Sequence, residues 1–296
     1  MKTKLNNILI TGGAGFIGSN LISYIKKNYN FNKIISIDNY YSGNKKNHII
    51  DKKILYLKIS TLDILNTKNR TFRKFKPNLV FHFAEFSRIV PSFKKFDDCM
   101  KFNTVGTLNV IKYASKNNSK LIYSGSSSKF GKEQNEHLSP YSFTKSKNIE
   151  LIKNFNKWFG LKYVIVYFFN VYGSNQIKNH FMSAVIAIFE EQFKKGIPLT
   201  VVKPGTQKRD FTHVDDIVNG TMLAALNSEN DEFQIGSGRP YKLIEVAKMF
   251  KTDISLTPER PGERFSGKAD YLKAKRKLGY KPKKNLEKYI RDFIKK

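Results

Sequence analysis

Tyr141 and Lys145 stand four residues apart in the stretch SPYSFTK, a spacing that brings two side chains to one face of a helix. A phenol, with a reference pKa of about 10, is a poor base at neutral pH, but a neighbouring ammonium ion favours the phenolate. The pair could therefore take a proton from a substrate hydroxyl. The same spacing recurs in this lysine-rich chain at Tyr29/Lys33, Tyr41/Lys45, Tyr271/Lys275 and Tyr280/Lys284. Spacing alone does not single out Tyr141, so its place in the fold must.

A glycine-rich turn, TGGAGFIG, lies between the first apolar run and an amphipathic stretch. Gly12, Gly15 and Gly18 allow a tight turn and a close approach of the backbone to a pyrophosphate, whose charge is met by a helix N-terminus. Asp38 ends the second apolar run, where a carboxylate accepts hydrogen bonds from an adenosine ribose and repels a 2′-phosphate. The pattern predicts NAD as cofactor rather than NADP.

Apolar runs alternate with helical patterns through the first half of the chain. Strands are predicted at 7–11, 33–38, 54–59, 79–84, 120–124 and 163–169, and helices at 16–27, 99–116 and 140–159. This alternation predicts an α/β fold with a Rossmann-type, doubly wound parallel sheet. We expect an NAD-binding domain over 1–169, to which the chain returns around 208–236, and a smaller C-terminal lobe over 170–296.

The 296-residue chain has a formal net charge of +29. Its lysines are scattered among many Asn, Ile, Phe and Tyr residues, which all have AT-rich codons, so we expect no nucleic-acid partner. The apolar runs are too short for a membrane helix, and no secretory signal is expected. The single Cys99 fits a reducing, cytoplasmic location. No spacing of Cys, His and Asp predicts a metal site.

The spacing of the glycines resembles the short-chain dehydrogenase/reductase superfamily, and the C-terminal half resembles its extended branch, which processes nucleotide sugars. The similar stretches follow one another along nearly the whole chain: LVFHFAEFSRIV, FNTVGTLNV, LIYSGSSSKFG, SPYSFTKSK, YFFNVYG, QKRDFTHVDDIV, FQIGSGRP and RPGERFSGKADYLKAKRKLGY. The chain is most similar to UDP-glucose (UDP-galactose) 4-epimerases. The resemblance implies NAD-dependent epimerisation at C4 of a UDP-sugar, with or without an N-acetyl group, through a transient 4-keto intermediate.

The resemblance also implies roles for single residues. Tyr141 would be the base, Lys145 would keep it ionised, and Ser126 would hydrogen-bond the same sugar oxygen. Cofactor contacts are expected at Gly12, Gly15, Phe16, Ile17, Gly18, Asp38, Asn39, Asp63, Ile64, Phe83, Ala84, Glu85, Asn103, Ser124, Tyr141, Lys145 and Phe168. Substrate contacts are expected at Ser126, Asn170, Arg209, Arg260 and Glu263. The lobe over 170–296 would bind mainly the nucleotide sugar, and helices at 99–116 and 140–159 would pair in a homodimer.

Some positions depart from the usual pattern of these enzymes and leave alternatives open. Ser127 and Ser128 stand where a 4,6-dehydratase carries an Asp-Glu pair, which argues against elimination of water. Gly267 would leave room for an N-acetyl group at C2 of the sugar. Glu85 replaces a small residue near the nicotinamide end. The alternatives are a UDP-glucuronate 4-epimerase, another nucleotide-sugar dehydratase or reductase, or, in a different class, an NAD-binding regulatory or scaffold protein.

Overall fold

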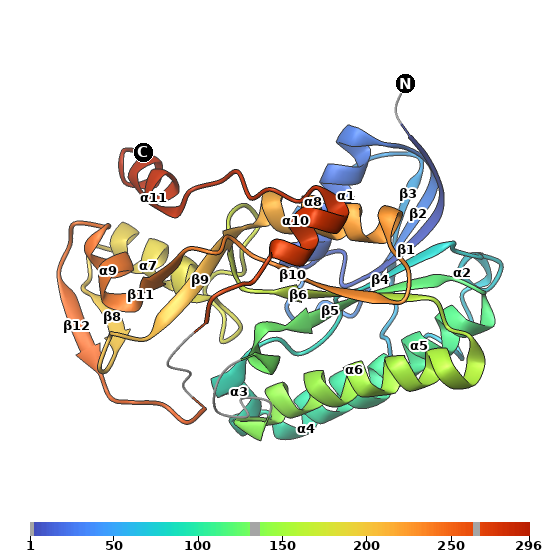
Figure 1. Cartoon of the computed structure of the whole chain (residues 1–296), viewed down its shortest axis with the longest axis horizontal. Helices are drawn as coiled ribbons and strands as arrows, with labels where there is room; N and C mark the ends of the chain where they lie inside the picture. The colour runs from blue at the N-terminus through green and yellow to red at the C-terminus, as the bar shows by residue number, and fades with distance from the viewer. Residues whose placement is uncertain (1–2, 131–136, 263–266) are drawn as a thin grey trace.

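A seven-stranded parallel sheet organises the larger part of the molecule, as seen in a computed structural model that describes residues 3–130, 137–262 and 267–296 (Figure 1). The strand order is β10-β6-β5-β4-β1-β2-β3. Its strands are β1 Lys4–Thr11, β2 Asn30–Asp38, β3 Ile54–Lys58, β4 Leu79–His82, β5 Lys120–Ser126, β6 Tyr163–Phe168 and β10 Asp231–Ile235. The order reverses between β1 and β4, the point at which such sheets bind nucleotides. The predicted doubly wound α/β fold is confirmed.

Helices cover both faces of this sheet, which explains why the interior of β1 is apolar without alternation. One face packs against α1 (Phe16–Asn28), α8 (Val214–Asn227) and α10 (Leu272–Leu278) (Figure 1). The other face packs against α2 (Arg70–Arg73), α5 (Thr107–Lys116) and α6 (Pro140–Phe159). Ile8, Leu9 and Ile10 are all fully buried between the two layers.

Helix α6 carries the pair from which the sequence analysis started, and its ends follow from local sequence. Ser139 caps its N-terminus by accepting a hydrogen bond from the backbone N–H of Ser142, and Pro140 occupies the first turn. Gly160 ends the helix in the left-handed conformation, with φ of 68°. Beside it, α3 (Ile89–Lys94) precedes α4 (Phe96–Met100), the π-helical stretch η2 (Lys101–Gly106) and α5.

The smaller lobe has its own core and two small sheets. One sheet has the order β11-β9-β7, from Pro240–Lys242, Lys208–His213 and Asn170–Tyr172, and the other pairs β12 (Ile254–Thr257) with β8 (Leu199–Val202). The helices α7 Val185–Lys194, α9 Leu243–Lys248 and α11 Leu286–Ile294 complete it, and the short helices η1 Lys45–Asn47 and η3 Ser127–Lys129 lie in the larger part. The chain returns to the large sheet through α8 and β10, whereas β9, predicted within the returning segment, belongs to the small sheet.

Candidate active site

A cleft of about 640 Å³ lies at the carboxyl ends of the central strands of the large sheet. Its walls include Gly12 after β1, Asp38 at the end of β2 and Ser126 at the end of β5. The smaller lobe contributes Asn170 and Arg209 to the same cleft. A cavity of this size and mixed origin is typical of a site for a small molecule and its cofactor.

The glycine-rich turn at one end of the cleft fits the pyrophosphate of a dinucleotide. Gly12 has φ of +76°, and a Cβ atom there would lie 2.9 Å from the backbone nitrogen of Ala84. A Cβ atom on Gly18 would lie 2.3 Å from the carbonyl oxygen of Gly12. Among the described residues, no side chain caps the start of α1, so its first N–H groups are available to an anion.

Asp38 fixes the turn against the end of β2. Its Oδ2 accepts a hydrogen bond from the backbone of Ala14 at 3.1 Å, and its Oδ1 accepts one from the backbone of Tyr40 at 2.8 Å. Burial raises the pKa of Asp38, and these two hydrogen bonds partly offset the rise. The carboxylate and the neighbouring Asn39 both line the cleft, as predicted for contacts to the adenosine ribose.

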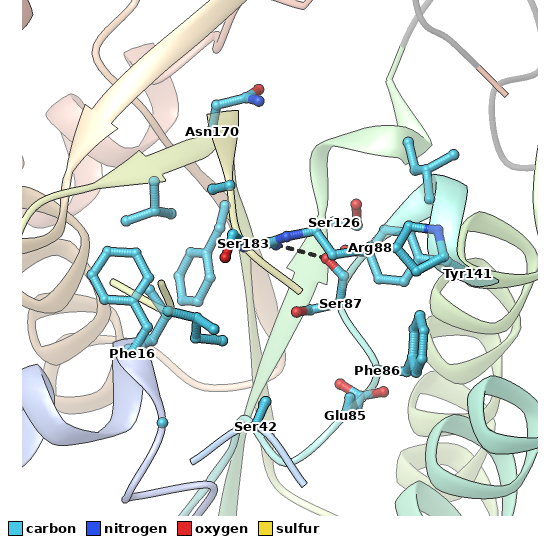
Figure 2. Close-up of a pocket in the computed structure, with 18 of the residues that line it drawn as sticks. Phe16, Ser42, Glu85, Phe86, Ser87, Arg88, Ser126, Tyr141, Asn170 and Ser183 are labelled. Atoms are coloured by element: carbon cyan, nitrogen blue, oxygen red, sulfur yellow. Dashed lines mark hydrogen bonds between the residues drawn. The ribbon is translucent and has the colours of Figure 1, made fainter. Parts of the chain in front are cut away.

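Ser126, Tyr141 and Lys145 all line the cleft, from two neighbouring elements. Ser126 ends β5, and its Oγ accepts hydrogen bonds from the backbone and the hydroxyl of Ser128. Tyr141 lies in the first turn of α6, where its ring packs in a cluster that includes Phe86. Figure 2 shows Ser126 and Tyr141 on the same side of the pocket. The fold therefore brings together the three residues to which the resemblance gives catalytic roles.

Lys145 is held in a buried ion pair with Glu85. The two side chains are 6% and 1% exposed, respectively. The ammonium group also donates to the carbonyl oxygen of Ser124 at 2.6 Å, and more weakly to its hydroxyl at 3.4 Å. The other carboxylate oxygen of Glu85 accepts three further hydrogen bonds, from Tyr123 Oη at 2.9 Å, Thr107 Oγ1 at 3.1 Å and Asn148 Nδ2 at 3.1 Å. Glu85 was predicted to contact the cofactor, but the structure commits its carboxylate to this network.

The network continues to the glycine-rich turn through His82. Its Nε2 lies 2.9 Å from Thr107 Oγ1, and its Nδ1 lies 2.7 Å from Thr11 Oγ1. Burial lowers the pKa of His82 to about 4, so the imidazole is neutral at neutral pH. A continuous chain of hydrogen bonds therefore joins Thr11, at the start of the turn, to Lys145.

Apart from Ser126, the residues predicted to contact the substrate lie in the smaller lobe, and those that the structure describes line the cleft. Asn170, Arg209 and Arg260 are among the lining residues, whereas Glu263 lies outside the described residues. Arg209 is followed by Asp210, which is fully buried and accepts hydrogen bonds from Ser237, Gly238 and Ala269. These bonds tie β9 to two connecting segments and fix the backbone that carries Arg209.

Three of the predicted cofactor contacts do not line the cleft. Asp63 is exposed in a turn after β3, and Ile64 is buried beneath the sheet in the apolar core. Ile59 and Thr61 line the cleft near that point. Asn103 is fully buried, and its side chain accepts a hydrogen bond from Phe86 N at 2.7 Å and donates to Phe86 O and Thr144. It holds the loop after β4 against α6 rather than facing the cofactor.

Arg88 is a residue of the cleft that sequence reasoning missed. It follows β4, and its Nη1 donates a hydrogen bond to the carbonyl oxygen of Ser87 at 2.8 Å. Its Nε is buried and has no hydrogen-bond partner among the described residues. Burial lowers the pKa of Arg88, and the nearby Tyr141 opposes that effect. The one signal in the sequence is a cation in the otherwise uncharged stretch FSRIVP, at the end of a strand where binding loops occur.

The other tyrosines with a lysine four residues on are placed less favourably for base catalysis. Burial raises the pKa of Tyr29, Tyr41 and Tyr280, and at Tyr41 a hydrogen bond to Asp98 adds to the effect. Tyr280 is fully buried, with Tyr271 packed edge-on against it. Among the five pairs, Tyr141 and Lys145 are the one pair with both members among the described residues that line the cleft.

The described part of the chain contains no group of three or more His, Cys, Asp or Glu side chains that could hold a metal ion. It also contains no helix that is both long and apolar enough to cross a membrane.

Comparison with known proteins identifies the family. A model of the NAD-dependent epimerase/dehydratase family matches residues 8–236. A putative UDP-glucose 4-epimerase of Methanocaldococcus jannaschii is 30% identical over 305 residues, which cover 97% of each chain. The UDP-glucose 4-epimerase of Thermotoga maritima, solved with UDP-glucose, is 30% identical with a TM-score of 0.87, over 98% of this chain and 97% of that one.

A second solved structure is the UDP-glucuronic acid 4-epimerase of Bacillus cereus, in complex with UDP-glucuronic acid and NAD. It is 26% identical to this chain with a TM-score of 0.86, and the match covers 98% of this chain and 99% of that one. Together with the glycine-rich turn, these matches confirm NAD as the cofactor. The chain belongs to the NAD-dependent epimerase/dehydratase family.

Proposed function

We propose that this enzyme epimerises a UDP-sugar at C4 through a transient 4-keto intermediate. The observation that carries the proposal is the convergence of Ser126, Tyr141 and Lys145 on a cleft that begins at a dinucleotide-type turn. Asn170, Arg209 and Arg260 line the same cleft and supply amide and guanidinium donors for the diphosphate.

The chain's own residues would move and hold the proton of the reacting hydroxyl. Tyr141 Oη takes the proton from the 4-hydroxyl of the sugar and returns it after the sugar has turned over in the cleft. Ser126 Oγ hydrogen-bonds the same sugar oxygen, and Lys145 favours the phenolate of Tyr141. NAD held at the glycine-rich turn would supply the hydride acceptor and donor that oxidation and reduction at C4 require.

Ser127 and Ser128 support epimerisation over dehydration. Elimination of water needs an additional acid and base, which the resemblance places at these two positions as Asp and Glu. Both serines are buried, and the Ser128 hydroxyl is already bound to Ser126. A hydroxyl of ordinary acidity in that setting is a poor substitute for a carboxyl group.

We propose UDP-glucose and UDP-galactose, or their N-acetylated forms, as the substrates. Gly267 is half-buried and is not among the residues that line the cleft, so the room for a substituent at C2 is proposed from the resemblance. A Gly267→Tyr variant should then lose activity on UDP-N-acetylglucosamine and keep it on UDP-glucose. Unchanged activity on the N-acetylated sugar would contradict this assignment.

The test of the reaction begins with the cofactor released from purified protein, which should be NAD. The same preparation is then assayed with UDP-glucose, UDP-N-acetylglucosamine and UDP-glucuronate. Conversion of one of these to its 4-epimer supports the proposal, whereas a stable 4-keto-6-deoxy product would favour a dehydratase. NAD release without turnover of any UDP-sugar would favour a regulatory or scaffold protein.

We further propose that the enzyme forms a homodimer through the outer face of α4, η2 and α6. Large apolar side chains are exposed there, with Phe96 51%, Val105 49% and Phe143 40% exposed. Apolar area of this kind on neighbouring helices is typical of an interface between subunits. Light scattering coupled to gel filtration should give twice the mass of the 34.2 kDa chain. A monomer mass at micromolar concentration would contradict the proposal.

A further inference from the structure

Arg88 presents a cation to the cleft without a counter-ion. Its Nη1 donates to the carbonyl oxygen of Ser87, and its buried Nε has no partner. Within the described residues, no carboxylate forms an ion pair with this guanidinium. Figure 2 shows Arg88 beside Ser87, in the loop that leads from β4 to α3, with its side chain in the space between the two walls of the pocket. Because Arg88 lines the cleft, donors of its guanidinium group that are not bound to Ser87 can serve a ligand there.

Arg88 is half-buried, and a charge that is partly removed from water without a partner is costly; arginine does not escape this cost by losing its proton. Removing a cation from water costs several kcal/mol unless an opposite charge and hydrogen bonds replace the water. The guanidinium group keeps its charge in proteins. An anionic group on the ligand would supply the opposite charge that Arg88 lacks, and this best explains an unpaired arginine at the cleft.

The surroundings of Arg88 suit an anionic oxygen group. The neighbouring lining residues Ser87, Ser126 and Ser183 carry hydroxyls, which can donate further hydrogen bonds to oxygen. The acidic residues among the described lining residues are Asp38, at the turn, and Glu85, which is paired with Lys145. Neither is therefore left to neutralise Arg88.

We propose that Arg88 binds an anionic oxygen group of the substrate at the end of the cleft that carries Ser126 and Tyr141. The inference rests on the proposed function, because it takes the ligand to be a UDP-sugar. Two groups of such a ligand have the required chemistry, a carboxylate on the sugar and the phosphate nearest to it. A guanidinium fork can bind either in a bidentate manner.

Calorimetric titration of the NAD-loaded enzyme with UDP, UDP-glucose and UDP-glucuronate tests the proposal and separates the two groups. Arg88→Met should weaken binding by about 30-fold or more, because it removes one partner of a buried charge pair. A loss with all three ligands identifies the phosphate, and a loss confined to UDP-glucuronate identifies the carboxylate. Arg88→Lys keeps the positive charge but loses the planar guanidinium fork. Its affinity for the ligand should therefore lie between those of the parent enzyme and Arg88→Met.

The matched control is Arg291→Met, which removes an exposed arginine on α11 and should bind every ligand like the parent enzyme. Melting temperature and bound NAD are measured for each variant, and Arg88→Lys carries the test if Arg88→Met does not fold. Parent-like affinity in the Arg88 variants, or a loss confined to UDP-glucose, would overturn the inference while leaving epimerisation intact. Failure of the parent enzyme to bind any of the three ligands would instead count against the proposed function.

Discussion

Lys145 and Arg88 are two cations that line one cleft, and they differ in whether a carboxylate of the described chain neutralises them. Lys145 is paired with a carboxylate that accepts three further hydrogen bonds, from residues of α5, β5 and α6. Arg88 has one hydrogen bond to a neighbouring carbonyl, and no counter-ion in the described part of the chain. Lys145 follows Tyr141 by one turn of α6, and Arg88, in the loop after β4, lies near Tyr141.

The difference separates a preorganised part of the site from a part that a ligand completes. A fully bonded ion pair holds its ammonium group in place before any ligand arrives, which suits the role that we propose for Lys145 toward Tyr141. An unpaired guanidinium gains a partner when an anion binds, so part of its desolvation cost is recovered on binding. The following predictions test each half of this comparison.

The largest effect is expected at Tyr141, the residue that we propose as the base. Tyr141→Phe removes the hydroxyl that is proposed to move the proton. General acid-base catalysis contributes about 10²–10⁴-fold, so kcat should fall by that factor. Bound NAD, measured after release, should be unchanged. Tyr271→Phe alters another member of the Tyr-x-x-x-Lys set, outside the cleft, and should leave kcat as it was. Equal losses in the two variants would contradict the assignment of the base.

The second-largest effect is expected when the ion pair between Lys145 and Glu85 is broken. Lys145→Met leaves the carboxylate of Glu85 buried without its cation, which should lower the free energy of unfolding by about 3–5 kcal/mol in urea titrations. Lys147→Met removes an exposed pair with Glu150 on the same helix and should cost at most about 1 kcal/mol.

The double variant Lys145→Met/Glu85→Gln separates stability from activity. Neutralising the orphaned carboxylate should restore much of the lost stability, because the buried charge is gone. Activity should stay low, since the cation that favours the phenolate of Tyr141 is still absent. If the double variant recovered activity as well as stability, Lys145 would have a structural role and no role in catalysis.

His82 gives the preorganised side a pH dependence that Arg88 does not share. Its pKa is about 4 in the folded protein and near 6.5 in the unfolded chain, so between these values the unfolded chain binds the additional proton. Stability should therefore fall as pH decreases through this window, by on the order of 2 kcal/mol between pH 6.5 and 5. Urea titrations at several pH values should show a smaller loss over that range for His82→Gln. Parallel curves for the two proteins would rule out His82 as the titrating group.

The sequence predicted the strands, helices and glycine-rich turn of this site better than it predicted the ion pairing of its charged residues. Strand-helix alternation and the glycine-rich turn are local patterns, and the structure forms the sheet and places Gly12, Gly15 and Gly18 at the cleft. The partners of Glu85 come from separate elements, so neither its burial nor its pairing with Lys145 could be inferred from spacing.

The expected cofactor contact of Asn103 and the omission of Arg88 have one cause, because both depend on contacts that form only in the folded chain. Asn103 lies in a π-helical stretch, where it is fully buried and bonds to Phe86 instead of facing the cofactor. Arg88 is one arginine in a chain of 53 basic residues, and what marks it is the absence of a counter-ion among the described residues. That absence is a property of the packed structure, because it depends on which acids the fold brings near.

The smallest predicted effect concerns how Glu85 limits the influence of Lys145 on Tyr141. The carboxylate neutralises the ammonium charge, so Glu85→Gln should leave Lys145 better able to favour the phenolate. The acid limb of the profile of kcat/KM against pH should then move to lower pH. Glu150→Gln, which removes an exposed carboxylate from the same helix, should leave the limb in place. A limb that stays fixed in Glu85→Gln, or moves to higher pH, would mean that Glu85 only positions the ammonium group and does not offset its charge.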